Sequence, residues 1–236
     1  MYDVNGNVTN IWSSNLNGVN RLMAILAAMI AATAPLGCAD RKATAERAIR
    51  AQPGRIRWAT GLLGKLVTTG GIISPDFPTT ANAMQPSAPG IGTAFVTRLN
   101  PLGTPGQFLD YSTYLGGSGG DVAYDVAADS AGIIYVAGYT LSADFPVTPD
   151  AVQSRFGAGI EAFLVKLDPS VAGKGALRYG SYFGTTGMHV ATGLAVAPDG
   201  SVFLGGYTTS SLQTTASAYQ GSFGNGYTDG FVLAVK

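Results

Sequence analysis

Three aspartates spaced four residues apart form the cluster that most resembles a metal site. Asp121, Asp125 and Asp129 follow one another within a single segment. A calcium loop places its acidic ligands at alternate positions, so a spacing of four does not fit it. Asp129 belongs to the turn sequence "DSAG", and Asp125 is expected on the side away from the apolar residues. We therefore expect structural roles for these acids, and no bound metal or cofactor.

The sequence has one histidine, His189, which could act as a base. A histidine base needs a nucleophile to activate, and no G-x-S-x-G motif accompanies it. His189 occupies the position of Asp121 when the copies of an internal repeat are aligned. We expect a surface residue at this loop-to-strand junction, and no catalytic residue in the chain.

Closely spaced glycines precede Asp121 in "GGSGGD", residues 116–121. Glycine-rich loops cradle phosphates when a helix follows them. Here a β-type segment follows, so the pattern favours a flexible connection between structural units.

The N-terminal part, residues 1–53, differs from the rest of the chain. Residues 22–38, "LMAILAAMIAATAPLGC", form an apolar run that is short for a membrane span and ends at Cys38, the only cysteine. Two interpretations stay open: a signal segment with Cys38 as a lipidation site, or a buried alanine-rich helix. Residues 39–53 predict a basic helix ended by Pro53-Gly54, and a solvated face explains its charge more simply than affinity for anionic lipid.

Composition favours a β protein. Charged residues make up 12% of the chain, 33 residues are Gly, and Tyr and Phe number 11 and 10. Many glycines and aromatic residues suit turn-rich strands. The formal net charge of zero gives the whole molecule no electrostatic attraction to nucleic acid.

An internal repeat of period 68 runs from about residue 64 to residue 236. "SPDFPTTANAMQ" (74–85) and "SADFPVTPDAVQ" (142–153) share seven of twelve positions. "AFVTRLNP" (94–101) returns as "AFLVKLDP" (162–169), and "YSTYLGG" (111–117) returns as "YGSYFGT" (179–185). The repeat predicts a structural unit built in tandem.

Each repeat contains four short β-type segments. Val122, Tyr124, Val126 and Ala128 are expected to point to one face, and the residues between them to the other. Four strands at a fixed interval are typical of a propeller blade. The sequence therefore predicts an all-β fold over residues 54–236, a partial β-propeller of about three four-stranded blades, preceded by the short helical leader 1–53.

These motifs resemble a known family. The run from "YSTYLGGSGGDVAYDV" through "GYTLSADFP" to "AFLVKLDP" is similar to the bacterial β-propeller repeat abbreviated SBBP. The resemblance covers roughly three quarters of the chain. It implies secreted or cell-surface proteins made of tandem blades, usually with no assigned catalytic activity.

The repeated Asp-Phe-Pro element is interpreted as a structural corner that every blade needs. Proline restricts the backbone after the second strand, and phenylalanine can anchor the loop between blades. Recurring tyrosines are expected to pack in the core, although aromatic rims can also stack on sugars. The predicted anchors are Asp76, Phe77, Pro78, Asp144, Phe145, Pro146, Tyr111, Tyr114, Tyr179 and Tyr182.

Two functions stay open on the sequence. The first is a non-enzymatic extracellular or cell-surface module for adhesion, scaffolding or ligand binding, with a protein or carbohydrate partner. The second is a blade portion of a propeller enzyme, a lyase or glycosidase acting on extracellular polysaccharide. Propellers close with roughly four to eight blades, so we expect this chain to self-associate or to join further blades in a longer protein.

Overall fold

A computed structural model of the protein describes residues 57–60, 65–100, 109–224 and 226–236. The expectations for residues 1–53, including the helix and Cys38, lie outside them. Within the described residues, no helix is long and apolar enough to cross a membrane. The described fold is all-β, as predicted, and one short 3-10 turn, η2 (Gly173–Ala176), interrupts it.

The strands form three antiparallel sheets, which follow one another along the chain. The first sheet has the order β1 (Arg57–Thr60), β2 (Leu66–Ile72), β3 (Thr93–Leu99), β4 (Leu109–Leu115). The second has the order β5 (Asp121–Ala128), β6 (Ile134–Thr140), β7 (Glu161–Leu167), β8 (Leu177–Phe183). The third contains β9 (His189–Val196), β10 (Val202–Thr208) and β11 (Asp229–Val235). The prediction of four strands in every unit is thus wrong for the third sheet, which has three strands among the described residues.

Turn residues set the hairpins between the first two strands of the second and third sheets. Gly132 and Gly200 have φ values of 85° and 84°, a region that glycine enters without steric cost. Asp129 Oδ1 accepts hydrogen bonds from the backbone N–H groups of Ala131 and Ile133, both at 2.9 Å. Asp129 is therefore a turn residue, as its sequence context predicts.

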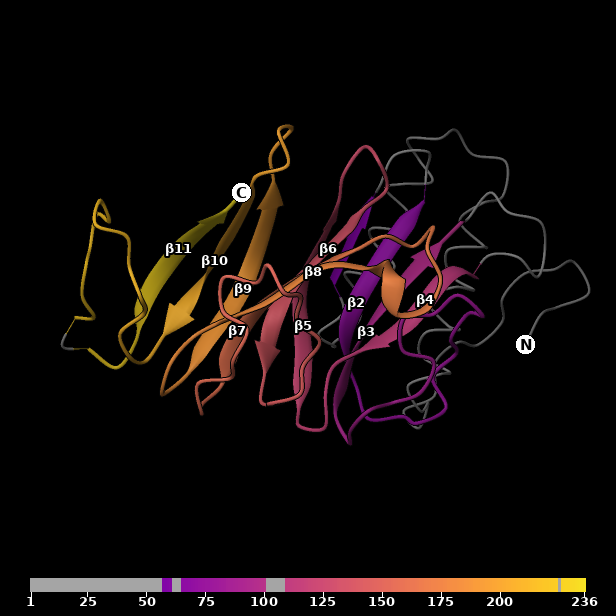
Figure 1. The fold of residues 1–236 in the computed structure, drawn as a ribbon, viewed down its shortest axis with the longest axis horizontal. Helices are drawn as coiled ribbons and strands as arrows, with labels where there is room; N and C mark the ends of the chain where they lie inside the picture. The colour runs from indigo at the N-terminus through magenta and orange to yellow at the C-terminus, as the bar shows by residue number, and fades with distance from the viewer. Residues whose placement is uncertain (1–56, 61–64, 101–108, 225) are drawn as a thin grey trace, which may run out of the picture.

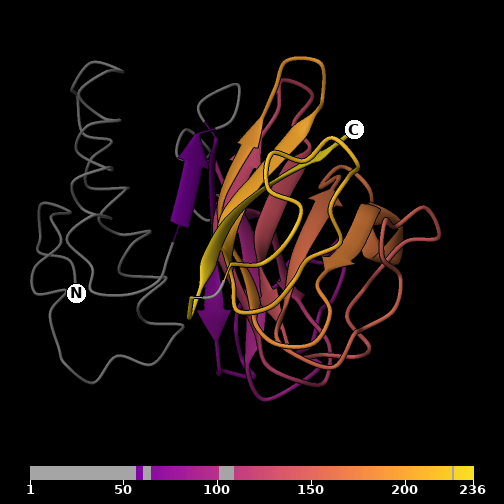
Figure 2. The ribbon, with the colours of Figure 1, turned by 90° about the vertical axis from the view of Figure 1, so that its left-hand side faces the viewer.

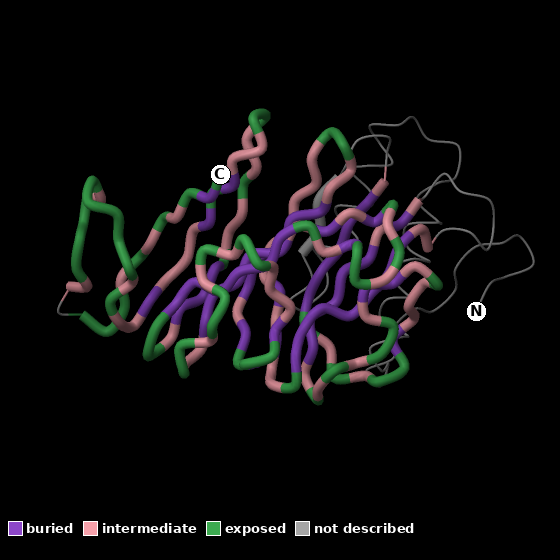
Figure 3. The backbone as a smooth tube through the Cα atoms, viewed as in Figure 1, coloured by how far each residue is buried: buried purple, intermediate pink, exposed green. Residues whose placement is uncertain are grey.

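The three sheets stand face to face along the long axis of the molecule (Figures 1 and 2). The core between the first and second sheets includes Val67, Val96, Phe163 and Val165. The core between the second and third sheets includes Tyr135, Leu164, Leu204 and Val235. Burying each such side chain fully contributes about 1.5–3 kcal/mol, so these two apolar layers hold the sheets together. In Figure 3 the buried residues lie mainly along the strands, where neighbouring sheets face each other.

β-Bulges interrupt the alternation predicted for the inner strands, which are the first strands of the second and third sheets, β5 and β9. The register of β5 shifts between Ala123 and Asp125, which leaves Tyr124 as the extra residue. Ala123 consequently joins Val126 in the core against the first sheet, and Val122 and Tyr124 do not share the face of Val126 as expected. A corresponding shift in β9 leaves out Thr192, which aligns with Tyr124 in the repeat. A bulge reverses the side-chain pattern at one residue, so a strict period of two fails here.

Gly138 in β6 and Gly206 in β10 lie where the neighbouring bulged strand, β5 or β9 respectively, comes closest to them. A Cβ atom at Gly138 would collide with the carbonyl oxygen of Val122, and one at Gly206 with that of Val190. Gly205 faces open space, with no heavy atom within 4 Å of a Cβ built there. The glycine is therefore required at 138 and 206, and dispensable at 205.

We predict that Gly138→Ala lowers the free energy of unfolding by about 3 kcal/mol, because the methyl group forces β5 and β6 apart. Gly205→Ala, the matched control, changes it by less than about 1 kcal/mol. Urea unfolding followed by tryptophan fluorescence and circular dichroism measures both values. Equal midpoints for the two variants contradict the close approach.

Candidate functional site

Asp121, the first residue of β5, lies at the centre of a buried polar corner between the first and second sheets. Its side chain is 1% exposed. Oδ1 accepts hydrogen bonds from Thr140 Oγ1 at 2.5 Å and Ser142 Oγ at 2.9 Å, and Oδ2 accepts one from the Gly117 N–H at 2.9 Å. The carboxylate thus joins the end of β6 to the glycine connection before β5.

Burial raises the pKa of Asp121 from 3.8 to about 6, although its hydrogen bonds to Thr140, Gly117 and Ser142 act in the opposite direction. Desolvation disfavours a buried charge, and donated hydrogen bonds only partly compensate. The raised pKa would suit a general acid. However, both oxygens of Asp121 are engaged by its own chain, so the geometry assigns the carboxyl group to holding the corner.

His189 occupies the equivalent corner between the second and third sheets and makes equivalent contacts. The Thr185 N–H donates to Nε2 at 3.0 Å, and Nδ1 lies 2.8 Å from Thr208 Oγ1. Ser210 Oγ lies 3.4 Å from Nε2. The repeat aligns these three partners with Gly117, Thr140 and Ser142, in that order. His189 is 0% exposed, so the prediction of a surface residue is wrong, because the imidazole replaces the buried carboxylate.

The contacts of His189 define its tautomer. Nε2 accepts the Thr185 N–H, so the proton of the neutral ring must be on Nδ1. Nδ1–H then donates to Thr208 Oγ1, whose own proton goes to the Ser210 carbonyl at 2.6 Å. Burial holds the pKa of His189 below its usual 6.5, against a smaller opposing effect of the Thr186 backbone. In a protonated ring, Nε2 would also carry a hydrogen, which would point at the Thr185 N–H.

The glycine connection 116–120 is an ordered part of the corner. Three successive N–H groups donate to side chains: Gly117 to Asp121, Ser118 to Asp144 at 2.8 Å, and Gly119 to Ser142 at 2.9 Å. Successive N–H groups in a turn form an anion-binding concavity, and here two carboxylates of the same chain fill it. The prediction of a flexible connection is wrong, because two of the three acceptors lie beyond the end of β6, far from the connection in the sequence.

The Asp-Phe-Pro elements lie directly beside these corners. Phe145 is 3% exposed, and its ring centroid lies 4.6 Å from that of Phe163 and 6.0 Å from that of Tyr182. Phe77 packs in the same way on Phe95 and Tyr114, at 4.8 and 5.6 Å. Each phenylalanine therefore attaches its loop to the third and fourth strands of its own sheet.

Two of the predicted tyrosine anchors hold this loop through their hydroxyl groups. Tyr182 Oη accepts the Phe145 N–H at 3.1 Å and donates to the Ser142 carbonyl at 2.8 Å. Tyr114 Oη does the same with Phe77 and Ser74, both at 2.9 Å. Burial is the main reason that the pKa of Tyr182 is raised to about 12, so the phenol keeps the proton that it donates.

The remaining predicted anchors have more varied surroundings. Tyr111 is fully buried and Tyr179 is 8% exposed, and the Lys166 ammonium lies 5.5 Å from the Tyr179 ring centroid. The carbonyl of Pro78 accepts the Ser112 hydroxyl at 2.6 Å, whereas that of Pro146 lies against Gly180, the residue equivalent to Ser112. The hydrogen bond that Asp76 accepts within the described residues comes from the nearby Ser74 hydroxyl, whereas Asp144 accepts from Ser118 in the glycine connection, so Asp76 lacks this cross-linking role.

The other acids of the initial cluster have separate structural partners. Asp125 Oδ2 accepts the Leu194 N–H at 2.8 Å, which ties β5 to β9 in the next sheet. The segments of the chain that the structure describes contain no group of three potential metal ligands. Asp121, Asp125 and Asp129 therefore do not converge on one point.

Sequence reasoning missed two sets of corner residues. Glu161 is fully buried, accepts hydrogen bonds from Gln153 Nε2 at 2.9 Å and the Gly157 N–H, and has its pKa raised by burial. Gln85 and Gln153 accept the N–H groups of Gly116 and Gly184, at 2.9 and 3.0 Å. Recurrence in the repeat was the available signal for the glutamines, and also for Glu161, which aligns with Thr93 in the first sheet but with another acid, Asp229, in the third.

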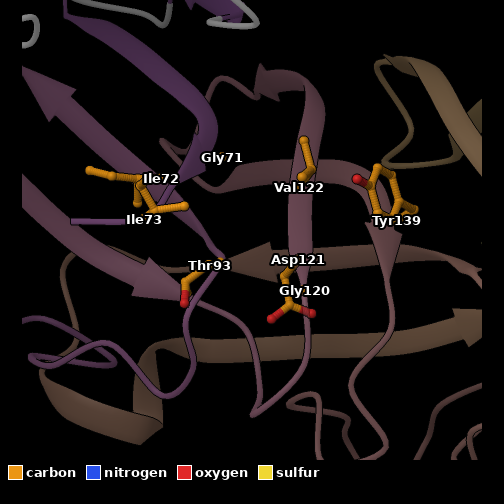
Figure 4. A pocket seen from close by; sticks show the side chains of 9 residues that line it. Gly71, Ile72, Ile73, Thr93, Gly120, Asp121, Val122 and Tyr139 are labelled. Carbon is orange, nitrogen blue, oxygen red and sulfur yellow. The ribbon is translucent and has the colours of Figure 1, made fainter. Parts of the chain in front are cut away.

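A pocket of about 410 Å³ lies beside the first corner, between the end of β2 and the start of β5. Ile72, Ile73, Val122 and Tyr139 supply most of its wall, and Thr93 and Asp121 supply oxygens (Figure 4). Its volume is within the range of small-molecule sites. The arrangement can hold a small, largely apolar ligand or one face of a sugar ring.

Comparison with known proteins supports the repeat. A family model described as a beta-propeller repeat, SBBP, matches residues 110–146, from β4 through the glycine connection, β5 and β6 to Pro146. The resemblance to this family is confirmed over these residues. No curated protein matches the chain.

We predict that nitrogen NMR of the single imidazole shows the Nδ1–H tautomer with a pKa below 6.5. The unfolded chain then takes up the proton first, so the free energy of unfolding falls as the pH decreases below about 6.5 and levels off below the folded pKa. His189→Asp is the matched variant. Its buried carboxyl should have a raised pKa, as at Asp121, so its contribution to stability declines as the pH rises from about 4 to about 6. A normal histidine pKa in the folded protein contradicts the buried corner.

Proposed function

We propose that this chain is a non-enzymatic β-propeller repeat module, exported to the outside of a bacterial cell, where it binds a protein or carbohydrate ligand or acts as a scaffold. The three successive sheets would then be an arc of a propeller. The match over residues 110–146 supports the module class, and the signal-like sequence of residues 22–38 supports export.

One observation carries the non-enzymatic assignment. The buried titratable groups of the two corners, Asp121 and His189, have the same kind of partners at equivalent positions, and these partners are structural. A catalytic group is specific to one site and must reach substrate. Repetition of the corner at both junctions between the sheets fits a structural part.

The glycosidase or lyase alternative draws on the pocket beside Asp121, whose raised pKa would suit an acid. Most glycosidases use two carboxyl groups that flank the scissile bond. The described lining of the pocket has a single carboxyl group, that of Asp121. We therefore favour binding over hydrolysis.

A glycan and protein array with the full chain, followed by polysaccharide hydrolase and lyase assays, tests this proposal. We expect binding to one ligand class and no product release. Ile73→Ser should weaken a ligand bound in the pocket about ten-fold, because Ile73 is 82% exposed and lines it. Val152→Ser, a change at a residue that is 70% exposed and outside the pocket, is the control. Product release that Asp121→Asn abolishes would favour the enzyme.

The export part of the proposal has its own test. Mass spectrometry of the protein from bacterial membrane and secreted fractions should show a chain that begins at or just after Cys38, with or without a lipid on that residue. An intact Met1 in the cytosolic fraction contradicts export.

The outer face of the third sheet supports assembly. In the second sheet, Tyr135 and Leu164 are buried under the third sheet, at 5% and 0% exposure. The equivalent residues of the third sheet, Phe203 and Val232, are 44% and 82% exposed. Exposed apolar sheet faces promote association. We propose that in the isolated chain this face packs against a second copy.

Light scattering coupled to size-exclusion chromatography should show a species larger than 24.1 kDa at micromolar concentration. Phe203→Glu should shift it toward the monomer, because a carboxylate cannot be buried there without a partner. Tyr227→Glu, a change at a fully exposed loop residue, is the control and should leave the mass unchanged. A stable wild-type monomer contradicts this assembly.

A further inference from the structure

The edge of β11 that faces away from β10 has no strand beside it in residues 57–60, 65–100, 109–224 and 226–236. β11 pairs with β10 along its whole length, from Asp229 to Val235. The equivalent strands, β3 and β7, pair on both edges, and their second partners are the fourth strands β4 and β8. An open edge presents unpaired N–H and C=O groups that can pair with another strand.

In the first two sheets, a glutamine from the loop between the second and third strands forms hydrogen bonds to the edge of the fourth strand that faces away from the third strand. The Gln153 carbonyl accepts the Tyr182 N–H at 3.1 Å, its N–H donates to Ser181 Oγ at 3.0 Å, and its Oε1 accepts the Gly184 N–H at 3.0 Å. Gln85 makes the same three contacts with Tyr114, Thr113 and Gly116, at 3.1, 2.8 and 2.9 Å. The fourth strand therefore lies between the third strand and a glutamine clamp.

The third sheet has the same clamp without a strand in it. Gln220 Nε2 donates to Ser222 O at 3.0 Å and Asp229 Oδ2 at 3.2 Å, as Gln153 Nε2 donates to Arg155 O and Glu161 Oε2. Asp229 also accepts the Gly224 N–H at 2.5 Å, so the loop and the start of β11 are already joined. Among the described residues, no hydrogen bond involves the main chain or Oε1 of Gln220.

The exposure of side chains agrees with an uncovered edge of β11. Residues of β7 are buried at all but one position, whereas those of β11 alternate between intermediate and exposed until Val235. Figure 1 shows the Gln220 loop on the side of β11 away from β10.

We propose that the β11 edge and the Gln220 loop bind an extended peptide segment with the fourth-strand pattern: Tyr, two small residues, Tyr, Leu or Phe, and Gly. The segment runs antiparallel to β11. Its second Tyr lies opposite Phe231, as Tyr114 lies opposite Phe95 and Tyr182 opposite Phe163. Its Gly N–H donates to Gln220 Oε1. Strand addition of this kind takes affinity from the backbone and specificity from alternate side chains.

The occupant must be a segment with the fourth-strand pattern that is not already paired within a sheet. A second folded copy has its own β4 and β8 paired within their sheets, so it cannot donate them without losing those sheets. This edge is also distinct from the outer face that contains Phe203, and the inference does not rest on the ligand or the self-association proposed above.

Fluorescence anisotropy with a labelled peptide of residues 109–117, LDYSTYLGG, and the full-length chain tests the proposal. We expect saturable binding that weakens about ten-fold when the second Tyr of the peptide is replaced by Ala. Gln220→Ala should weaken it about five-fold, the effect of losing one hydrogen bond. Gln213→Ala, in the same loop and exposed, is the matched control and leaves binding unchanged.

Cross-strand NOEs between the second Tyr of the peptide and Phe231 should establish the register. The proposal is overturned if a scrambled peptide binds equally well, if Gln220→Ala has no more effect than Gln213→Ala, or if no binding is detected. Cross-linking that shows β11 paired with β11 of a second copy overturns it as well. Repeating the titration with Phe203→Glu distinguishes failure of this proposal from failure of the proposed self-association, because that change removes self-association and leaves the β11 edge intact.

Discussion

The structure depends on a buried hydrogen-bond acceptor at the first residue of the inner strand. Asp121 takes this position in the second sheet and His189 in the third, and each is almost inaccessible to solvent. A buried acceptor is costly unless donors surround it, so the donors must keep their places. The partners of both residues come from the connection before the strand and from the end of the next strand, where Thr140 donates to Asp121 and Thr208 accepts from His189. This requirement fixes where one sheet ends and the next begins.

The packing of the sheets follows from that junction. The backbone N–H of Asp121 donates to the Gly92 carbonyl at 3.0 Å, and that of His189 donates to the Ile160 carbonyl at 2.7 Å. Each inner strand thereby starts beside the third strand of the preceding sheet, and the apolar layers can close between them. The bulges at Tyr124 and Thr192 then turn the strand, and glycine at 138 and 206 allows the close approach.

The internal repeat made the all-β fold, the order of strands and the loop with Asp-Phe-Pro predictable, because tandem units repeat their hydrophobic pattern. The bulge was not predictable, because strict alternation assumes that each residue of one strand lies opposite one residue of the next. The sequence pattern therefore placed Ala123 on the wrong face of the sheet. His189 was misjudged because histidine and aspartate look unrelated as residue types. Both side chains accept a hydrogen bond from the connection before the strand, and for His189 only the Thr185 N–H reveals it.

Amide hydrogen exchange of the full-length chain tests the role of the buried acceptor most directly. The account predicts that Gly117 and Thr185, which lie outside the strands, exchange as slowly as core amides of β6 and β7, because their N–H groups bond to Asp121 and His189. Asp121→Ala should release Gly117, and His189→Ala should release Thr185, each without affecting the other. Exchange of Gly117 and Thr185 at the rate of exposed loop amides in the unmodified protein would contradict the account.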